Sequence, residues 1–132
     1  MDVEQIEAKH VKKGKYILID DSPSIVSDNA TSAPGKHGHA KCRITATGII
    51  DGKKRVIMRP GDGKVPSPVV DKRNGQIVSI DGDRAQLMDA ETYEMFDTKI
   101  PDNLKAKAKE GVMVDYWLIG GEIRIIVDVK DE

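Results

Sequence analysis

The chain of 132 residues consists of short apolar and β-branched runs that turn-forming residues interrupt again and again. Such runs predict strands at 16–19, 24–27, 41–50, 53–58, 76–80, 84–88, 92–96, 112–119 and 122–129. Asp51-Gly52 favours a two-residue type I′ turn, and Asp81-Gly82 and Gly120-Gly121 favour other tight connections between neighbouring strands. This alternation predicts an all-β protein.

Two prolines divide the chain into two predicted domains. Pro66 and Pro68 cannot donate hydrogen bonds within a sheet, so the stretch around them is expected to be an edge or a linker. We place the boundary there, with an N-terminal domain at 1–68 and a C-terminal domain at 69–132. The first suits an SH3-like barrel. The second, with five strands and one short helix expected over 101–111, suits an OB-fold.

Charge is distributed unequally between the two halves. Residues 1–70 hold 12 Lys and Arg against 8 Asp and Glu, whereas residues 71–132 hold 9 against 14. Any contact with a polyanion is therefore expected in the first half. The single cysteine, Cys42, excludes an internal disulfide, and the acidic start lacks the apolar region of a secretory signal. We expect a cytoplasmic protein with no membrane partner.

The segment from Asn29 to Ile50 contains no acidic residue. Within it, Pro34 and Gly35 are expected to end one strand and Gly38 to let the chain return, which predicts Lys36 at the tip of a hairpin. The tip is followed by Lys41 and Arg43, whose alternation along a strand directs both side chains to one face. We predict that these two cations hold RNA phosphate. A second cluster, Lys53, Lys54 and Arg55, either joins that contact or solvates an edge strand.

Other functions of the same loop agree less well with its residues. A phosphate-binding glycine loop would need more glycines and a following helix. His37 and His39 lack a neighbouring Cys or carboxylate to complete a metal site, so we expect loop contacts from them and no metal. A catalytic lysine would need a depressed pKa, which a tip flanked by glycines does not favour. Without an acid–base or nucleophile constellation, no catalytic residue and no enzyme activity is expected.

The segment Pro34-Gly35-Lys36-His37-Gly38-His39-Ala40-Lys41 resembles the modification loop of the translation initiation factor 5A family. The similarity continues through Asp71–Gln76, Ala85–Asp89, Glu91–Glu94 and Asp115–Trp117, and thus covers nearly the whole chain in order. Pro34 stands where eukaryotic members have a hydroxyl residue, which indicates the archaeal form. The family is related to bacterial elongation factor P.

The resemblance implies an SH3-like barrel followed by an OB domain. It also implies that Lys36 receives an aminobutyl group from spermidine, made by deoxyhypusine synthase, to give deoxyhypusine or, after hydroxylation, hypusine. Gly35 and Gly38 would then provide backbone clearance. Such a protein binds the ribosome and uses the modified lysine to stabilise peptidyl-tRNA and promote peptide bond formation at stalling sequences such as proline runs.

Two rival interpretations follow from the fold. A generic single-stranded RNA binder would stack bases on exposed aromatic residues of the OB domain. We expect the aromatic residues of that half to be core residues instead, namely Tyr93, Phe96, Tyr116 and Trp117. A self-assembling structural protein, like the Woronin-body core protein of the same fold, would not be expected to carry the lysine loop.

Overall fold

The computed structural model describes residues 1–32 and 40–130 of the chain. The chain divides into two compact units, Met1–Val69 and Val70–Glu132, each with its own sheets. All regular elements of the described residues are strands or 3₁₀ turns. The all-β class predicted from the sequence is confirmed.

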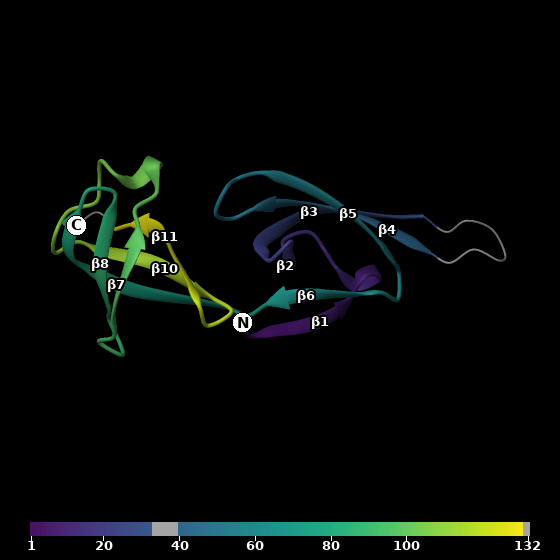
Figure 1. Ribbon diagram of the computed structural model, residues 1–132, viewed down its shortest axis with the longest axis horizontal. Helices are drawn as coiled ribbons and strands as arrows, with labels where there is room; N and C mark the ends of the chain where they lie inside the picture. Colours follow the sequence, from purple (N-terminus) through teal and green to yellow (C-terminus); the bar gives the residue numbers. More distant parts are fainter. Residues whose placement is uncertain (33–39, 131–132) are drawn as a thin grey trace. The chain divides into compact units, whose positions relative to one another are not determined.

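The N-terminal unit is a curled half-barrel of antiparallel strands (Figure 1). Its elements are β1 (Val3–Glu7), the 3₁₀ turn η1 (Ala8–His10), β2 (Tyr16–Ile19), β3 (Ser22–Ser32), β4 (Lys41–Gly48), β5 (Lys54–Pro60) and β6 (Lys64–Pro68). Strands β2 to β5 form one sheet in chain order, and β1 pairs with β6. Both prolines of the predicted edge lie in β6, where Pro66 is opposite Gln5 of β1.

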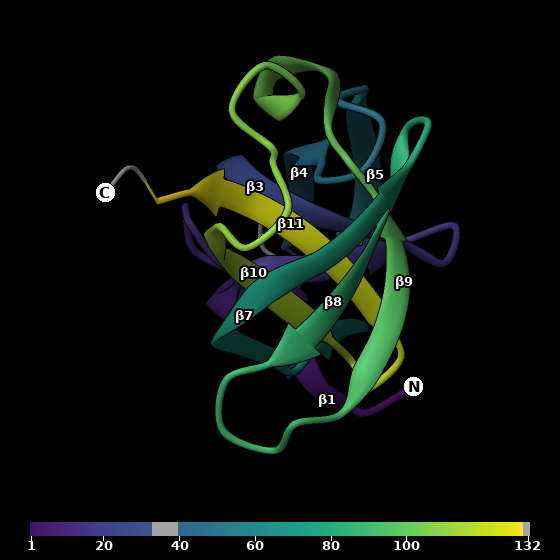
Figure 2. The same ribbon diagram turned by 90° about the vertical axis from the view of Figure 1, so that its left-hand side faces the viewer.

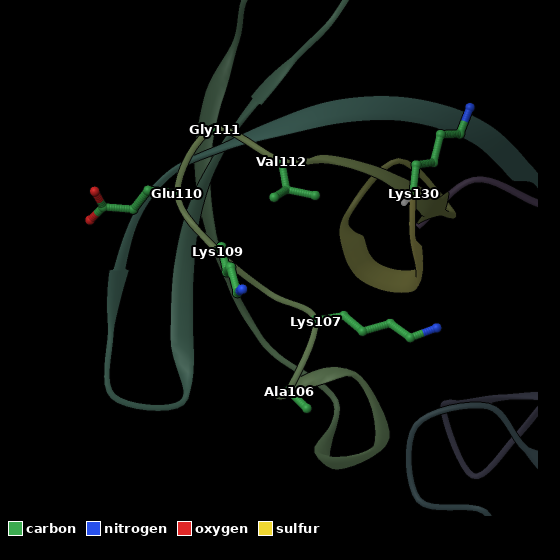
Figure 3. Close-up of a pocket in the computed structure, with 7 residues that line it drawn as sticks. All are labelled: Ala106, Lys107, Lys109, Glu110, Gly111, Val112 and Lys130. Atoms are coloured by element: carbon green, nitrogen blue, oxygen red, sulfur yellow. The ribbon is translucent and has the colours of Figure 1, made fainter. Parts of the chain in front are cut away.

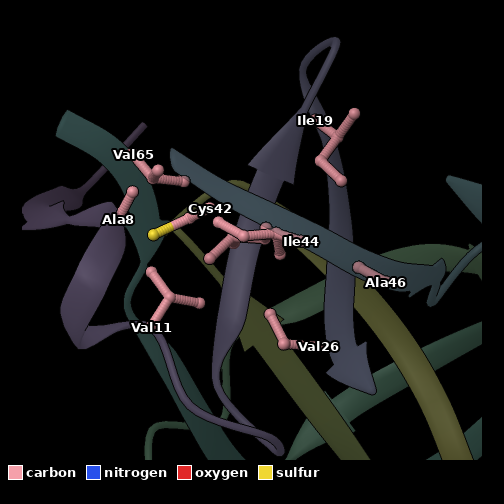
Figure 4. Close-up of a cluster of buried hydrophobic side chains, with 9 residues drawn as sticks. Ala8, Val11, Ile19, Val26, Cys42, Ile44, Ala46 and Val65 are labelled. Carbon is pink, nitrogen blue, oxygen red and sulfur yellow. The ribbon is translucent and has the colours of Figure 1, made fainter. Parts of the chain in front are cut away.

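The core of this unit comes from strict alternation along its strands. On β4, Cys42, Ile44 and Ala46 are fully buried while the residues between them face outward. Val11, Val26 and the other small β-branched or aliphatic side chains close around them, as Figure 4 shows. Because one face of the sheet is buried, the alternation fixes which side chains of β4 point to solvent.

The C-terminal unit is an OB fold of five strands in the order β11-β10-β7-β8-β9 (Figure 2). Its elements are β7 (Val70–Asp81), β8 (Arg84–Asp89), β9 (Met95–Lys99), the 3₁₀ turn η2 (Asp102–Leu104), β10 (Met113–Ile119) and β11 (Ile123–Val129). The barrel closes between its two edge strands, where the hydroxyl of Thr98 on β9 donates to the backbone carbonyl of Arg124 on β11 at 2.8 Å. A separate core forms around Ile77, Leu87 and Ile126.

Two predicted elements are wrong. The helix expected over 101–111 is only the three-residue turn η2. Leu104 is buried and Ala108 packs on the same core, but Ala106 is exposed, so the apolar face is too small to stabilise a longer helix. The strand expected at 92–96 begins later, at Met95, because the side chain of Asp89 holds the backbone N–H groups of Glu91 and Thr92 in a turn.

The predicted type I′ turn also lies elsewhere. Asp51-Gly52 is part of a longer connection between Gly48 and Lys54, and only Gly52 of the pair has a positive φ, 68°. A two-residue connection in which both residues have positive φ, 50° and 62°, is Asp20-Asp21 between β2 and β3. Asp tolerates this left-handed conformation better than most residues because its short side chain can hydrogen-bond locally. The tight link predicted at Asp81-Gly82 is also a two-residue connection, Gly82-Asp83, between the paired Asp81 and Arg84. Gly120-Gly121, with φ of 62° and 74°, forms the predicted tight link between β10 and β11.

Candidate functional site

The hairpin of β3 and β4 supports the lysine segment predicted from the sequence. Its last described pairs are Thr31 opposite Cys42 and Ser32 opposite Lys41. The segment between Ser32 and Lys41 therefore connects the ends of two neighbouring strands. The predicted residues Gly35, Lys36, His37, Gly38 and His39 lie outside the described residues. Their roles stay predictions, while the base that supports them can be described.

The base of the hairpin is tied to two other parts of the unit. The N–H of Gly61, just after β5, donates to the carbonyl of Ala40 at 2.8 Å, and the N–H of Lys9 donates to the carbonyl of Gly61 at 3.0 Å. A side chain at Gly61 would come within 3.4 Å of the Cβ of Ala40 and 3.7 Å of the Cβ of Lys9. Turn η1, the β5–β6 connection and the start of β4 therefore converge at this point.

Asn29 adds an anchor that sequence reasoning missed. Its side-chain amide donates to the carbonyls of Ala8 at 2.9 Å and Val11 at 2.7 Å, which brackets turn η1. The residue lies opposite Ile44, on the inner side of β3. An asparagine at an inward position of a strand needs hydrogen-bond partners, so its place in the strand could have indicated an anchoring role. Its partners are about 20 residues away along the chain, so they could not be identified without the fold.

The outer face of β4 presents Lys41 and Arg43, which are both exposed, as predicted. Lys41 lies opposite Pro60 and Arg43 opposite Met58 of β5. Lys54 shares this outer face, opposite Thr47, but four residues along β5 from Met58, or about 13 Å at the usual rise per residue. Lys54 is therefore on the same face as Lys41 and Arg43 but separate from them along it, whereas Arg55, opposite the buried Ala46, is on the other face.

Arg55 differs from the other predicted RNA contacts. Its guanidinium binds Asp51 through two contacts, Nη1 to Oδ1 at 3.0 Å and Nη2 to Oδ2 at 2.5 Å. Oδ1 of Asp51 also accepts the backbone N–H of Lys53 at 2.9 Å. The hydrogen bond from Arg55 holds the pKa of Asp51 well below its usual range. Arg55 thus closes the β4–β5 connection, whereas Lys53 and Lys54 are exposed.

The structure adds three basic residues near the base of the hairpin that the sequence did not indicate, namely Lys9, His10 and Lys64. Lys9 and His10 of η1 are exposed, and the carboxylate of Glu7 lies 3.3 Å from the Lys9 amine, 3.9 Å from His10 and 3.6 Å from Lys64. The pKa of Glu7 is lowered chiefly by its contact with Lys9. Only the fold shows that η1 lies beside the end of the hairpin.

In the OB unit, the buried carboxylate of Asp89 organises a polar network. It accepts from Nε of Arg73 at 2.6 Å, from the Tyr116 hydroxyl, and from the backbone N–H groups of Glu91 and Thr92 at 2.8 and 2.9 Å. The hydrogen bond from Arg73 keeps the pKa of Asp89 far below its usual range. Burial, and then the bond to Asp89, raises the pKa of Tyr116 to about 12.

A hollow in the OB unit is lined by three lysines, one glutamate and small or apolar residues, a set that does not resemble an active site. Figure 3 shows its lining, which comprises Ala106, Lys107, Lys109, Glu110, Gly111, Val112 and Lys130. Lys130 lies 3.4 Å from Asp115 of β10. Among residues 1–32 and 40–130, no group of three or more His, Cys, Asp and Glu is arranged to hold a metal ion. Within the same residues, no helix is long and apolar enough to cross a membrane.

Comparisons with known proteins agree with this architecture. Residues 2–62 match the family model described as "Translation initiation factor 5A-like, N-terminal", and residues 69–130 match the one described as "Eukaryotic elongation factor 5A hypusine, DNA-binding OB fold". A translation initiation factor 5A of Methanopyrus kandleri is 47% identical, over 98% of this chain and 96% of that protein. The corresponding protein of Thermococcus sibiricus is 46% identical, over 95% and 94%.

Solved structures give the same result. The eukaryotic translation initiation factor 5A from Methanococcus jannaschii superposes with a TM-score of 0.84 at 35% identity, covering 97% of this chain and 95% of that one. A family protein from Naegleria fowleri gives 0.80 at 29% identity, with 99% and 100% covered. Fold and relatives together define a non-catalytic translation factor with a hypusine-bearing domain. The chain belongs to the translation initiation factor 5A family, in its archaeal type.

Proposed function

We propose that Lys36 carries deoxyhypusine or hypusine and that the modified side chain stabilises peptidyl-tRNA on ribosomes stalled at sequences such as proline runs. The observation that carries the proposal is the hairpin base: β3 and β4 remain paired as far as Ser32 and Lys41, on both sides of the Gly35-Lys36-His37-Gly38 segment. An eight-residue segment between two paired strands would offer a lysine to a modifying enzyme without disrupting the core.

The chemistry of the modification suits a role in orienting substrates. An aminobutyl extension adds about 6 Å of reach at ordinary bond lengths and a second amine, without adding bulk. Such a thin polycation can contact phosphate or ribose oxygens between RNA backbones. The protein would break no bond itself and would help by positioning groups that the ribosome already holds. Gly35 and Gly38 would leave space for the chain, and His37 and His39 would contact RNA beside it.

The cations on the outer face of β4 support an RNA contact at the base of the loop. Lys41 and Arg43 are exposed and point to one side, next to the end of the hairpin. Lys53 and Lys54 would extend this contact along β5. Arg55 could contact phosphate only by leaving Asp51, so we propose that its main contribution is to hold the connection that carries Lys53.

The proposal is tested by changing Lys36 to Ala and measuring peptide synthesis through a proline run in a reconstituted translation system. We expect the variant to fold normally and to lose the relief of stalling. Lys13→Ala removes the same charge from an exposed position of the same unit and should retain activity. Full activity of Lys36→Ala, or peptide mapping that finds Lys36 unmodified in the native protein, would contradict the proposal. Deoxyhypusine synthase is the modifying partner we expect.

A further inference from the structure

Tyr93 is an exposed aromatic residue held in an unusual backbone conformation. Its side chain is 69% exposed, contrary to the expectation that it belongs to the core. Its φ is 62°, in the left-handed region that disfavours residues with a Cβ. Because the ring is in solvent, its own packing does not compensate for this conformation. Residues kept in such conformations cluster at binding and switch sites, where the surrounding structure fixes them.

The turn that carries Tyr93 is fixed by its own hydrogen bonds. Figure 2 shows it as the connection between β8 and β9, extending beyond the ends of both strands. All six consecutive backbone N–H groups from residue 89 to residue 94 are bonded within the unit. The N–H of Asp89 donates to the carbonyl of Glu94 at 2.9 Å, and that of Ala90 donates to the carbonyl of Asn74 at 2.9 Å. Oδ1 of Asp89 accepts from Glu91 and Thr92 at 2.8 and 2.9 Å, and its carbonyl accepts from Tyr93 at 3.0 Å. The N–H of Glu94 donates to Oγ1 of Thr92 at 3.3 Å. A turn organised in this way loses little entropy when it binds a partner.

The surroundings of Tyr93 are apolar and acidic. Met95, at the start of β9, is 47% exposed and lies opposite the half-buried Met88 of β8. The side chains of Glu91 and Glu94, on either side of the tyrosine in sequence, are 85% and 64% exposed. An exposed aromatic residue that lies two positions from an exposed methionine and has glutamates nearby in sequence suits a lysine or arginine side chain, whose stem packs on apolar surface while its cation lies over the ring.

The same surroundings disfavour nucleic acid. A single strand would stack a base on the ring but bring phosphates close to Glu91 and Glu94. Two arginines offset them only in part, since Arg73 lies 3.7 Å from Glu91 and Arg124 donates to Glu94 at 3.1 Å. Arg73 also binds Asp89 and Asp71, so the four carboxylates of this cluster outnumber its two arginines. Residues 71–132 as a whole hold 14 acidic against 9 basic residues. Charge complementarity therefore selects a cationic polypeptide.

We propose that the turn 89–95 is a docking site for a lysine- or arginine-rich segment of a partner protein, with Tyr93 as its anchor. Met95 supplies the adjoining apolar contact, and Glu91 and Glu94 supply the charge. This site acts through the OB unit and is independent of the modification of Lys36, so either proposal can fail while the other stands.

The test is an NMR titration of the isotopically labelled full chain at physiological salt. One arm uses a short lysine- and arginine-rich peptide, and the other uses a single-stranded RNA of similar length. We expect the peptide to shift the amide signals of residues 89–95 and the RNA to leave them unchanged. Tyr93→Asn should weaken peptide binding about tenfold, as expected for loss of a cation–π anchor, and Tyr93→Phe should retain it.

The asparagine variant also separates binding from folding. Asn accepts the left-handed conformation more readily than Tyr, so the thermal midpoint of the OB unit should not fall although binding is lost. Ile50→Ala removes another exposed apolar side chain, 60% exposed in the N-terminal unit, and should leave peptide binding unchanged. Wild-type affinity in Tyr93→Asn, absence of peptide shifts at residues 89–95, or RNA shifts at those same residues would each overturn the proposal.

Discussion

Replacing Asp89 by Asn should severely destabilise the OB unit. The buried carboxylate has four donors, namely the Arg73 side chain, the Tyr116 hydroxyl and the backbone N–H groups of Glu91 and Thr92. Asn keeps the volume, so no cavity forms, but it replaces one acceptor oxygen by an amide that faces donors. It also removes the charge that neutralises Arg73. Breaking a buried ion pair on one side costs about 3–5 kcal/mol. Because one oxygen remains, we expect about 3 kcal/mol.

Urea unfolding followed by fluorescence measures this loss directly. The only tryptophan of the chain, Trp117 on β10, reports on the OB unit. With an m-value of about 1 kcal/mol/M for so small a unit, the midpoint should fall by about 3 M. Asp97→Asn changes an exposed carboxylate on β9 of the same unit and should stay within about 0.5 kcal/mol of wild type. A midpoint within about 0.5 M of wild type for Asp89→Asn would refute the reasoning.

The same variant has a defined dependence on pH. The folded-state pKa of Asp89 is depressed, so its stabilisation is present above the unfolded value of about 4 and is lost as the pH falls toward the folded value. The difference in unfolding free energy between wild type and Asp89→Asn should therefore be constant near neutrality and shrink below about pH 4. A difference that grew as the pH fell would show that the folded-state pKa lies above the unfolded value, and would contradict the ion pair with Arg73.

Two further predictions concern the N-terminal unit. Changing Asp20-Asp21 to Asn-Gly, which suits two residues of positive φ, should raise its stability by about 1 kcal/mol, and a lower calorimetric midpoint would contradict the assigned turn. Arg43→Gln should weaken ribosome binding and reduce the slope of log affinity against log salt by about one. Arg55→Gln should leave that slope unchanged, because its charge is paired with Asp51, and an equal loss of slope would show that it contacts phosphate.

Much of the fold follows from local alternation of residue types. The strand predicted at 16–19 coincides with β2, and the one predicted at 41–50 contains β4, on which Ile44 and Ala46 are buried. On β4 the buried apolar residues alternate with polar ones, so a period of two is unambiguous, whereas β2 was predicted from a short apolar run that follows a glycine. OB-type closure was inferred from strand number, and the Thr98 to Arg124 bond shows how the barrel is completed.

The errors arose where distant residues decide local structure. Within residues 101–111, only Leu104 and Ala108 pack on the core from one helical face, and a helix of about ten residues needs a larger apolar face to be stable. The start of β9 depends on Asp89, which is held by Arg73 and Tyr116 from other strands. No window of neighbouring residues contains that information.

The candidate site was predicted in part for the same reason. Exposure of Lys41 and Arg43 follows from their alternation with buried Cys42 and Ile44. The pairing of Arg55 with Asp51 could have been suspected from their spacing across a turn, whereas the anchoring of η1 by Asn29 required the fold. The sequence thus predicted which side chains reach solvent better than it predicted which of them are already paired.

The bulge in β3 determines where the hairpin can change in length. Val26 lies opposite Ala46 and Asp28 opposite Thr45, so Ser27 is one residue more than the partner strand requires. Deleting Ser27 would either remove the bulge or slide residues 28–32 by one position against β4, which would turn Asn29 away from Ala8 and Val11. Beyond the bulge, only paired insertions in both strands preserve the facing of every side chain, each adding about 7 Å per two residues. The distance between the core and the last described pair of the hairpin, Ser32 and Lys41, therefore changes only in discrete steps.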